Sequence, residues 1–239
     1  MLVLGVDTSS EVGAVGLVDE KGVLGEINIR LYRRHSEELL SNIDHLLQQT
    51  DYKVEDIEGI SVTNGPGSFT GLRIALSTVK IFAQALKIPV MGVSTLDMLS
   101  YNMTGINSSW LVPVMDARRQ RVYTSLYTEW NEDIRSVKVW DDTALSLDVL
   151  IQKLKEECGE DKIYIFGDGV NKYRNKFKET GLNIRLLSNY YHIPRGSILA
   201  ELGRFYLEKG LSDNYMKLLP NYLKKPQAEI NWLKKHKDG

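Results

Sequence analysis

The sequence predicts a two-lobed α/β fold, in which two halves with the same order of elements face each other across a cleft. Two observations lead to this prediction. A βββαβα order of strands and helices occurs twice along the chain, and 239 residues are enough for two compact halves. Hydrophobic residues make up 43% of the chain and charged residues 26%, which is typical of a globular protein.

The first half begins with strand-like segments and then changes to helical periodicity. A turn signal at residues 19–22 separates two of these strands, and Ser36 is a candidate N-cap for the first helix. The predicted elements are strands over 2–6, 12–18 and 23–31, a helix over 36–49, a strand over 57–63, a helix over 72–86, a strand over 89–93 and a helix from Ser94 or Thr95.

The second half repeats this order without obvious sequence identity to the first. The predicted elements are strands over 111–115, 122–127 and 136–140, a helix over 145–157, a strand over 162–166, a helix after Gly167-Asp168-Gly169, a strand over 184–187 and a helix over 196–208. Residues 101–109 are polar and contain Gly, Asn and Ser, so we expect an N-terminal lobe over 1–103 and a C-terminal lobe over 104–239. Such duplicated halves occur in the actin-like ATPase and sugar-kinase (ASKHA) superfamily.

Charge, cysteine content and hydropathy argue against a strongly basic nucleic-acid surface, an internal disulfide and a membrane protein. The net charge of -1 argues against a strongly basic nucleic-acid surface, so contact with RNA would need a local patch or a partner. The lysine-rich C-terminal segment fits either a solvated chain end or an RNA-binding segment. Cys158 is the single cysteine, which rules out a disulfide within the chain and suits a reducing cytosol. No signal peptide or membrane span is visible, so we expect a cytoplasmic protein without membrane association.

Two segments could bind a ligand. Asp7-Thr8-Ser9 follows the first strand, where a carboxylate and hydroxyls could hold a hydrated metal and a phosphate, although the same residues favour a plain hairpin turn. Residues 65–73, Gly-Pro-Gly-Ser-Phe-Thr-Gly-Leu-Arg, lie between a strand and a helix. Their glycines allow close approach of a ligand or of another chain, and a purely structural tight turn also fits. No lysine follows the final glycine, so this is not a P-loop.

Other features argue against a cofactor or a metal. The four histidines include no pair at chelating spacing, because His35 and His45 would lie roughly 15 Å apart along one helix. The second-half hairpin contains Asp116-Ala117-Arg118-Arg119-Gln120-Arg121, whose bulky side chains would obstruct a phosphate, or alternatively bind an anion themselves. We therefore expect no metal, no cofactor and no catalytic residue. The weak candidates for a ligand site are Asp7, Thr8, Ser9, Gly65, Gly67, Ser68 and Gly71.

The glycine-rich segment, preceded by Thr63-Asn64, resembles the signature of the TsaB (YeaZ) family. The motifs that agree with it are Asp7-Thr8-Ser9, Arg34-His35-Ser36-Glu37, Ser94-Thr95-Leu96, Met115-Asp116-Ala117-Arg118-Arg119 with Val122-Tyr123, and the run from Pro220 to Glu229 that contains Tyr-Leu-Lys-Lys-Pro-Gln-Ala-Glu. These matches extend from residue 5 to residue 229, so the resemblance covers the whole chain.

The resemblance implies a non-catalytic paralogue of TsaD, the enzyme that transfers a threonylcarbamoyl group to the adenosine beside the anticodon of tRNA. It implies binding to TsaD, with the small ATPase TsaE joining the pair, a homodimer when the chain is alone, and contact with tRNA only within the complex. The chain would be an accessory subunit and not an enzyme. Two alternatives stay open: an ATP-dependent phosphotransferase of the same superfamily, and a glycoprotease-like peptidase.

The helix over 72–86 supplies the expected partner surface. At roughly 100° per residue, it has a broad apolar face that should pack on this chain's own sheet and a narrower one nearly opposite, formed by Ile74, Ile81 and Ala85. The helix over 36–49 could cover that narrower face within the chain. We instead expect Ile74, Ile81 and Ala85 to contact the catalytic paralogue, with Leu40 and Leu47 flanking the contact.

Overall fold

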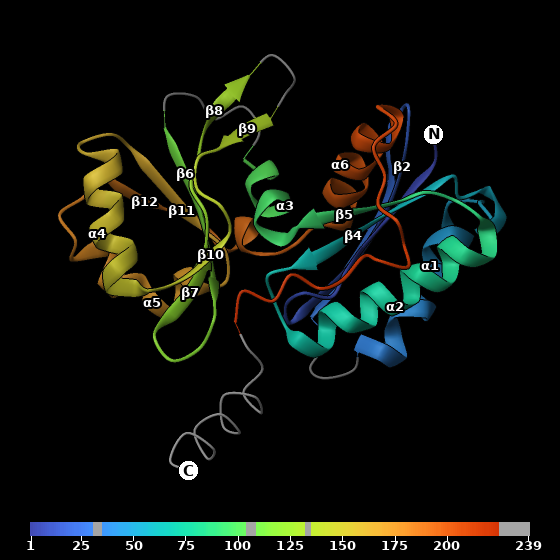
Figure 1. Cartoon of the computed structure of the whole chain (residues 1–239), viewed down its shortest axis with the longest axis horizontal. Helices are drawn as coiled ribbons and strands as arrows, with labels where there is room; N and C mark the ends of the chain where they lie inside the picture. The colour runs from blue at the N-terminus through green and yellow to red at the C-terminus, as the bar shows by residue number, and fades with distance from the viewer. Residues whose placement is uncertain (31–34, 104–108, 132–134, 225–239) are drawn as a thin grey trace, which may run out of the picture.

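The chain forms two lobes, each built around one β-sheet (Figure 1). The structure is a computed structural model and describes residues 1–30, 35–103, 109–131 and 135–224. The elements of the first lobe are β1 (Val3–Asp7), β2 (Val12–Asp19), β3 (Gly22–Arg30), α1 (His35–Gln49), the 3-10 helix η1 (Val54–Asp56), β4 (Gly59–Gly65), α2 (Phe69–Leu86), β5 (Val90–Ser94) and α3 (Thr95–Tyr101).

The remaining elements complete the second lobe and return to the first. They are β6 (Trp110–Asp116), β7 (Arg121–Thr124), β8 (Tyr127–Asn131), β9 (Arg135–Lys138), β10 (Thr143–Ser146), α4 (Leu147–Cys158), β11 (Ile163–Phe166), α5 (Gly169–Lys178), β12 (Ile184–Leu186), the 3-10 helix η2 (Asn189–His192) and α6 (Gly196–Glu208). The strand orders β3-β2-β1-β4-β5 and β10-β7-β6-β11-β12 repeat one arrangement, so the predicted duplicated α/β architecture is confirmed.

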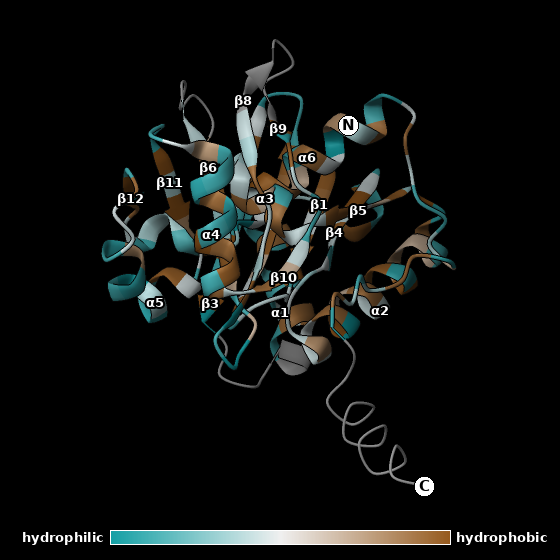
Figure 2. Cartoon of the chain, turned by 60° about the vertical axis from the view of Figure 1, so that its left-hand side comes forward, coloured by the Kyte–Doolittle hydropathy of each residue, from teal (hydrophilic) through white to brown (hydrophobic). Residues whose placement is uncertain are grey.

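The first sheet is covered by helices on both faces. Strand β1 pairs antiparallel with β2 and parallel with β4, and all five of its residues are buried. Because side chains alternate along a strand, Leu4 and Val6 point to the core beneath α1 and α2, whereas Val3 packs with Ala200 of α6. Figures 1 and 2 show α6 on one side of this sheet and α1 and α2 on the other.

The second lobe differs from its predicted strand pattern. The third strand of its main sheet is β10, which pairs with β7, and not the predicted segment 136–140. Strand β9 instead forms a hairpin with β8, which branches from β6. Strand β10 was not predicted, because its last two residues fall within the helix predicted over 145–157. In the structure that helix begins only after its N-cap, Ser146, which accepts a hydrogen bond from Val149 N at 3.4 Å. Local periodicity does not determine which short strand pairs with which neighbour.

Apolar packing joins the two lobes. Leu96 and Leu99 of α3 lie in one cluster with Leu199 of α6 and with Leu111 and Phe166 of the second sheet. Helix α6 follows the second lobe in sequence but packs on the first sheet. The division of the chain at residue 103 into two lobes stays a prediction.

The segment 213–224, which we call the C-terminal strap, connects the lobes a second time. Asp213 N donates to Val90 O at 2.8 Å, and Asn221 N donates to Asn64 O at 2.6 Å, both in the first lobe. Lys224 Nζ donates to Ala117 O in the second lobe at 2.6 Å. The predicted basic tail beyond residue 224 lies outside the described residues.

None of the helices in the described ranges is both long and apolar enough to cross a membrane. Figure 2 shows hydrophobic residues along the strands, with hydrophilic residues on the outer sides of α4 and α5.

Candidate functional site

Asp7, the first candidate ligand residue, is fully buried at the end of β1. Its Oδ1 accepts a hydrogen bond from Ser9 N at 3.1 Å and another from the hydroxyl of Thr63 on β4. Burial raises the pKa of Asp7 above its ordinary value. The carboxyl group therefore holds the end of β1 against the end of β4.

The glycine-rich loop packs against the turn between β1 and β2. Ser68 N donates to Ser9 O at 2.7 Å, and Thr8 Oγ1 donates to Gly71 O at 2.7 Å. A Cβ atom on Gly71 would overlap the carbonyl oxygen of Thr8, and one on Gly67 would overlap that of Ser9. The predicted close backbone approach is confirmed, and the group approached is the chain's own hairpin turn.

Helix α2 begins at Phe69, three residues earlier than predicted, with Ser68 as its N-cap. Ser68 Oγ accepts from Gly71 N at 3.3 Å. The broad apolar face packs on the sheet as predicted, and its buried residues are Leu72, Ala75, Leu76, Val79 and Ala83.

The opposite side of α2 faces outward. Ile81 is 68% exposed, Ala85 is exposed, and Ile74 is half-buried against the core. A large aliphatic side chain held this far into solvent on a well-packed helix is a candidate contact for another chain.

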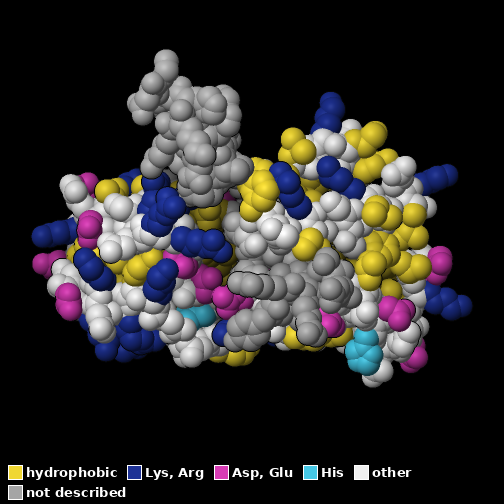
Figure 3. Space-filling model, turned by 90° about the horizontal axis from the view of Figure 1, so that it is seen from below, with side chains coloured by type: hydrophobic (Ala, Val, Ile, Leu, Met, Phe, Trp, Pro, Cys, Tyr) yellow, Lys and Arg dark blue, Asp and Glu magenta, His cyan; other side chains and the backbone are white. Residues whose placement is uncertain are grey.

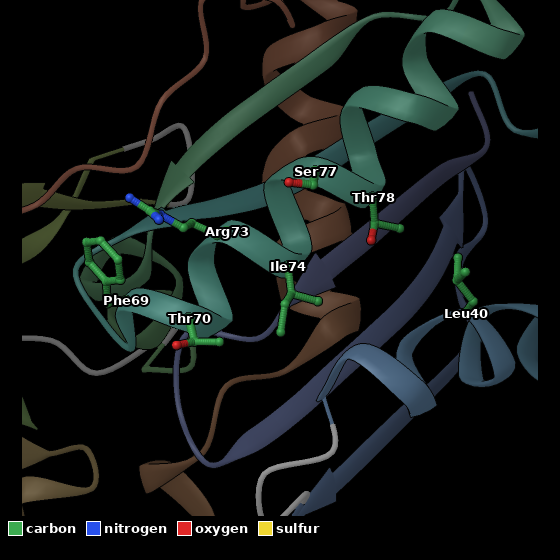
Figure 4. Close-up of a pocket in the computed structure, with 7 residues that line it drawn as sticks. All are labelled: Leu40, Phe69, Thr70, Arg73, Ile74, Ser77 and Thr78. Carbon is green, nitrogen blue, oxygen red and sulfur yellow. The ribbon is translucent and has the colours of Figure 1, made fainter.

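Two grooves border this exposed side. The first, with a volume of about 410 Å³, is lined by Leu40 of α1 and by Phe69, Thr70, Arg73, Ile74, Ser77 and Thr78 of α2 (Figure 4). The second, of about 350 Å³, lies between α2 and the C-terminal strap and is lined by Arg73, Leu76, Ser77, Lys80, Leu218, Leu219, Pro220 and Tyr222. Arg73 and Ser77 line both grooves and so mark the ridge between them.

The two flanking residues predicted on α1 differ in exposure. Leu40 is 55% exposed and lines the first groove. Leu47 is only 5% exposed and belongs to the core, so its prediction as a contact residue is wrong. The chain turns back after α1, where Tyr52 N donates to Leu47 O at 3.1 Å, and Tyr52 packs against the same core.

An aromatic stack fixes the C-terminal strap to the start of α2. The rings of Phe69 and Tyr222 are stacked with centroids 4.6 Å apart. The Arg73 guanidinium lies 4.0 Å from the Phe69 centroid, and Arg73 Nε donates to Tyr222 Oη at 2.9 Å. Sequence reasoning missed this contact because residues 149 positions apart share no periodic signal.

In the second lobe, the turn between β6 and β7 keeps its large side chains exposed. Arg118, Arg119 and Gln120 have φ values of 62°, 53° and 56°. Asp116 accepts hydrogen bonds from Lys172 Nζ at 2.7 Å and from Tyr173 Oη at 3.0 Å. This turn therefore carries arginines where the first lobe has Thr8 and Ser9.

His45 and His192 lie in different environments. His192 is buried, its Nδ1 accepts from Gly167 N at 3.1 Å, and burial lowers its pKa. His45 is exposed on α1. Among the described residues, no group of three or more His, Cys, Asp or Glu side chains is placed to hold a metal ion.

Comparison with known proteins establishes the family. A model for the family described as TsaD, tRNA N6-adenosine threonylcarbamoyltransferase, matches residues 20–232. The chain is 33% identical over 239 residues to the tRNA threonylcarbamoyladenosine biosynthesis protein TsaB of Bacillus subtilis (strain 168), covering 99% of this chain and 100% of that protein. The chain belongs to the TsaB family. A second TsaB, from Escherichia coli (strain K12), is 27% identical over 194 residues, covering 77% of this chain and 79% of that one.

Solved structures of other proteins resemble this chain in fold. YeaZ from Pseudomonas aeruginosa matches with a TM-score of 0.76 at 24% identity, covering 93% of this chain and 99% of that one. An activator of 2-hydroxyisocaproyl-CoA dehydratase from Clostridium difficile, with bound ADPNP, matches with a TM-score of 0.50 at 11% identity over 90% of this chain and 99% of that one. The duplicated two-lobed α/β fold predicted from the sequence is therefore confirmed.

Proposed function

We propose that this TsaB-family protein is an accessory subunit in the biosynthesis of threonylcarbamoyladenosine in tRNA, and that a TsaD-like catalytic paralogue docks on the exposed side of α1 and α2. The family supports the pathway, because curated relatives carry this role in their names. One structural observation carries the docking surface: Ile81 is 68% exposed on a helix whose other face is buried in the core.

The surface has the features of a helix-packing interface. Ile81 and Leu40 provide exposed apolar side chains on neighbouring helices, and grooves lie on both sides of the α2 ridge. Burying one large aliphatic side chain contributes about 1.5–3 kcal/mol, so a few such residues can dominate the affinity. A partner helix laid along α2 would cover Ile81 and Ala85, with Leu40 at the edge.

The proposal gives this chain no catalytic residue, metal or cofactor. The loop that would face a nucleotide is packed on the chain's own backbone, which supports a scaffold role. A small ATPase such as TsaE, self-association in the absence of the paralogue, and tRNA contact within the complex belong to the same proposal. Tight ATP binding by the isolated chain would favour the phosphotransferase alternative, and peptide cleavage would favour the peptidase alternative.

Ile81→Glu tests the docking surface. Because Ile81 makes few contacts within this chain, the variant should melt within about 1 °C of the parent, since surface changes usually cost less than about 0.5 kcal/mol. It should lose at least tenfold in affinity for the catalytic paralogue, because an unpaired charge would enter a dry contact. Calorimetry with the purified paralogue measures the affinity, and a reconstituted assay measures threonylcarbamoylation of tRNA.

Val149→Glu provides the matched control. Val149 is 44% exposed on α4 in the other lobe, so this substitution adds the same charge at another exposed aliphatic position on a helix. It should leave complex formation and tRNA modification unchanged. If Ile81→Glu still binds like the control, the paralogue docks elsewhere, and if it unfolds, Ile81 supports the fold.

A further inference from the structure

A cluster of positive charge lies on the second lobe, away from the proposed docking surface. Arg118, Arg119 and Arg121 are exposed on the turn between β6 and β7. In Figure 3, Lys and Arg side chains gather over the second lobe, in the left half of the view, whereas hydrophobic side chains gather over the first. A chain with a net charge of -1 thus concentrates cations locally.

The C-terminal strap adds a further cation to this turn. Lys224 Nζ donates to Ala117 O at 2.6 Å, which brings the lysine to the base of the hairpin. Burial lowers the pKa of Lys224, the positive charges of Arg121 and Arg119 lower it further, and the Asp116 carboxylate partly opposes them, so these groups are close enough to interact. Four cationic side chains therefore converge on one turn: Arg118, Arg119, Arg121 and Lys224.

The carboxylate of this turn balances the cluster only in part. Asp116, the carboxylate of the same turn, is already paired with Lys172, whose Nζ lies 2.7 Å from Asp116 Oδ2. Within the described part of the chain, none of the three arginines forms an ion pair with a carboxylate. Cations that repel one another without a counter-charge are stabilised by an anionic ligand.

The turn is also held in one conformation. Positive φ is unfavourable for non-glycine residues, so neighbouring groups must stabilise the three consecutive ones in this turn. Ala117 N donates to Arg121 O at 2.9 Å, and Leu147 N, at the start of α4, donates to Gln120 O at 3.1 Å. Arg118 and Arg119 thus project from a pre-organised backbone, which lowers the entropy cost of binding. Arg121 is held beside them by the hydrogen bond that its guanidinium donates to Ala144 O at 2.6 Å.

We propose that Arg118, Arg119, Arg121 and Lys224 form a binding site for the phosphodiester backbone of RNA. The site rests on the proposed function, which makes the tRNA substrate of the complex the expected RNA. We favour RNA over an acidic protein segment, because nucleic-acid interfaces are much more positively charged than protein–protein interfaces. Arginine forks match phosphate oxygens in pairs.

The test uses the complex of the full chain with the catalytic paralogue of the same organism. The probe is a labelled, unmodified tRNA transcript with an adenosine beside its anticodon, titrated between 50 and 200 mM salt. Arg118→Gln/Arg119→Gln should bind roughly tenfold more weakly at about 100 mM salt and lower the slope of log K against log[salt] by about 1–2. Arg118→Lys/Arg119→Lys keeps both charges and should retain the salt slope.

The control is Lys155→Gln/Lys178→Gln, which removes two exposed charges from α4 and α5 of the same lobe. It should bind tRNA like the parent. The RNA site is refuted if the arginine variant binds tRNA like this control. It is also refuted if that variant no longer binds the catalytic paralogue but keeps the salt slope of tRNA binding. If the parent complex binds tRNA and modifies it, the proposed function survives that refutation. If the parent complex does neither, the proposed function fails and the RNA site with it.

Discussion

The missing side chain of Gly71 allows the first turn of α2 to lie directly against Thr8. The Thr8 hydroxyl then reaches Gly71 O, and the neighbouring Ser68 N reaches Ser9 O. These contacts place the start of the proposed docking helix on the end of the central strand. A single added methyl group at this position would separate the two segments.

Gly71→Ala should therefore destabilise the protein by about 2–3 kcal/mol, because its Cβ would overlap backbone that cannot move aside cheaply. Urea denaturation followed by circular dichroism measures this loss. Gly181→Asn is the control, since Gly181 has a φ of 73° that asparagine tolerates and open space around it. Equal midpoints for the two variants would show that the loop relaxes more readily than the structure implies.

Sequence reasoning identified the residues of this loop but not what they contact. The spacing of Gly65, Gly67 and Gly71 predicts a close approach, which the structure confirms. Whether a ligand or the chain's own turn is approached depends on how β1 and β4 align. That alignment depends in part on the buried Asp7–Thr63 hydrogen bond, which joins residues far apart in sequence.

At the scale of elements, α2 shows what periodicity can and cannot predict. Its apolar spacing correctly predicted the buried face, because a helix repeats its surface every 3.6 residues. The C-terminal strap has no such period, so nothing in the sequence placed Leu218 in the core or Tyr222 on Phe69. The contact predicted for Leu47 was wrong because Leu47 lies on the buried face of α1 with Leu39, Ile43 and Leu46.

The stack at the start of α2 should hold the strap in place. Tyr222→Ala removes the ring contact, which is worth about 1 kcal/mol, and should speed hydrogen exchange at the Asn221 amide several-fold. Tyr222→Phe keeps the ring and loses only the hydrogen bond from Arg73, so it should exchange nearly as slowly as the parent. Unchanged exchange in the alanine variant would mean that backbone bonds alone hold the strap.

At the scale of the whole molecule, a polar network attaches α6 to the first sheet. The Glu26 carboxylate on β3 accepts hydrogen bonds from Arg195, whose Nε lies 3.0 Å away, and from Ser197. Burial alone would raise the pKa of Glu26, but these bonds outweigh it and lower the pKa below its ordinary value of 4.5.

Glu26→Gln should cost about 1.5–3 kcal/mol at neutral pH, the range for hydrogen bonds to a charged group. Because the pKa of Glu26 is lowered in the folded state, its ionised form stabilises the fold fully above pH 4.5 and progressively less as the pH falls through the folded-state pKa. The difference in stability between the parent and Glu26→Gln should therefore shrink in acid. Urea midpoints at neutral pH and below pH 4.5 measure it, with the exposed Glu55→Gln as control. A difference independent of pH would assign the loss to packing.

The two-lobed plan could be predicted because each sheet has its own run of strands and helices. The position of α6 could not, because an amphipathic helix pattern shows that one face is buried without showing which sheet buries it. The same limit explains β10, whose pairing with β7 depends on neighbours across the sheet.

The position of α6 sets an order of events during synthesis. The last strand of the first sheet ends at Ser94, but the helix that covers Val3 and Val18 is complete only at Glu208. At the usual rate of about 5–20 residues per second, translation of the intervening segment takes on the order of ten seconds. During that time the nascent chain presents one uncovered apolar face of this sheet, which is the kind of surface that chaperones bind.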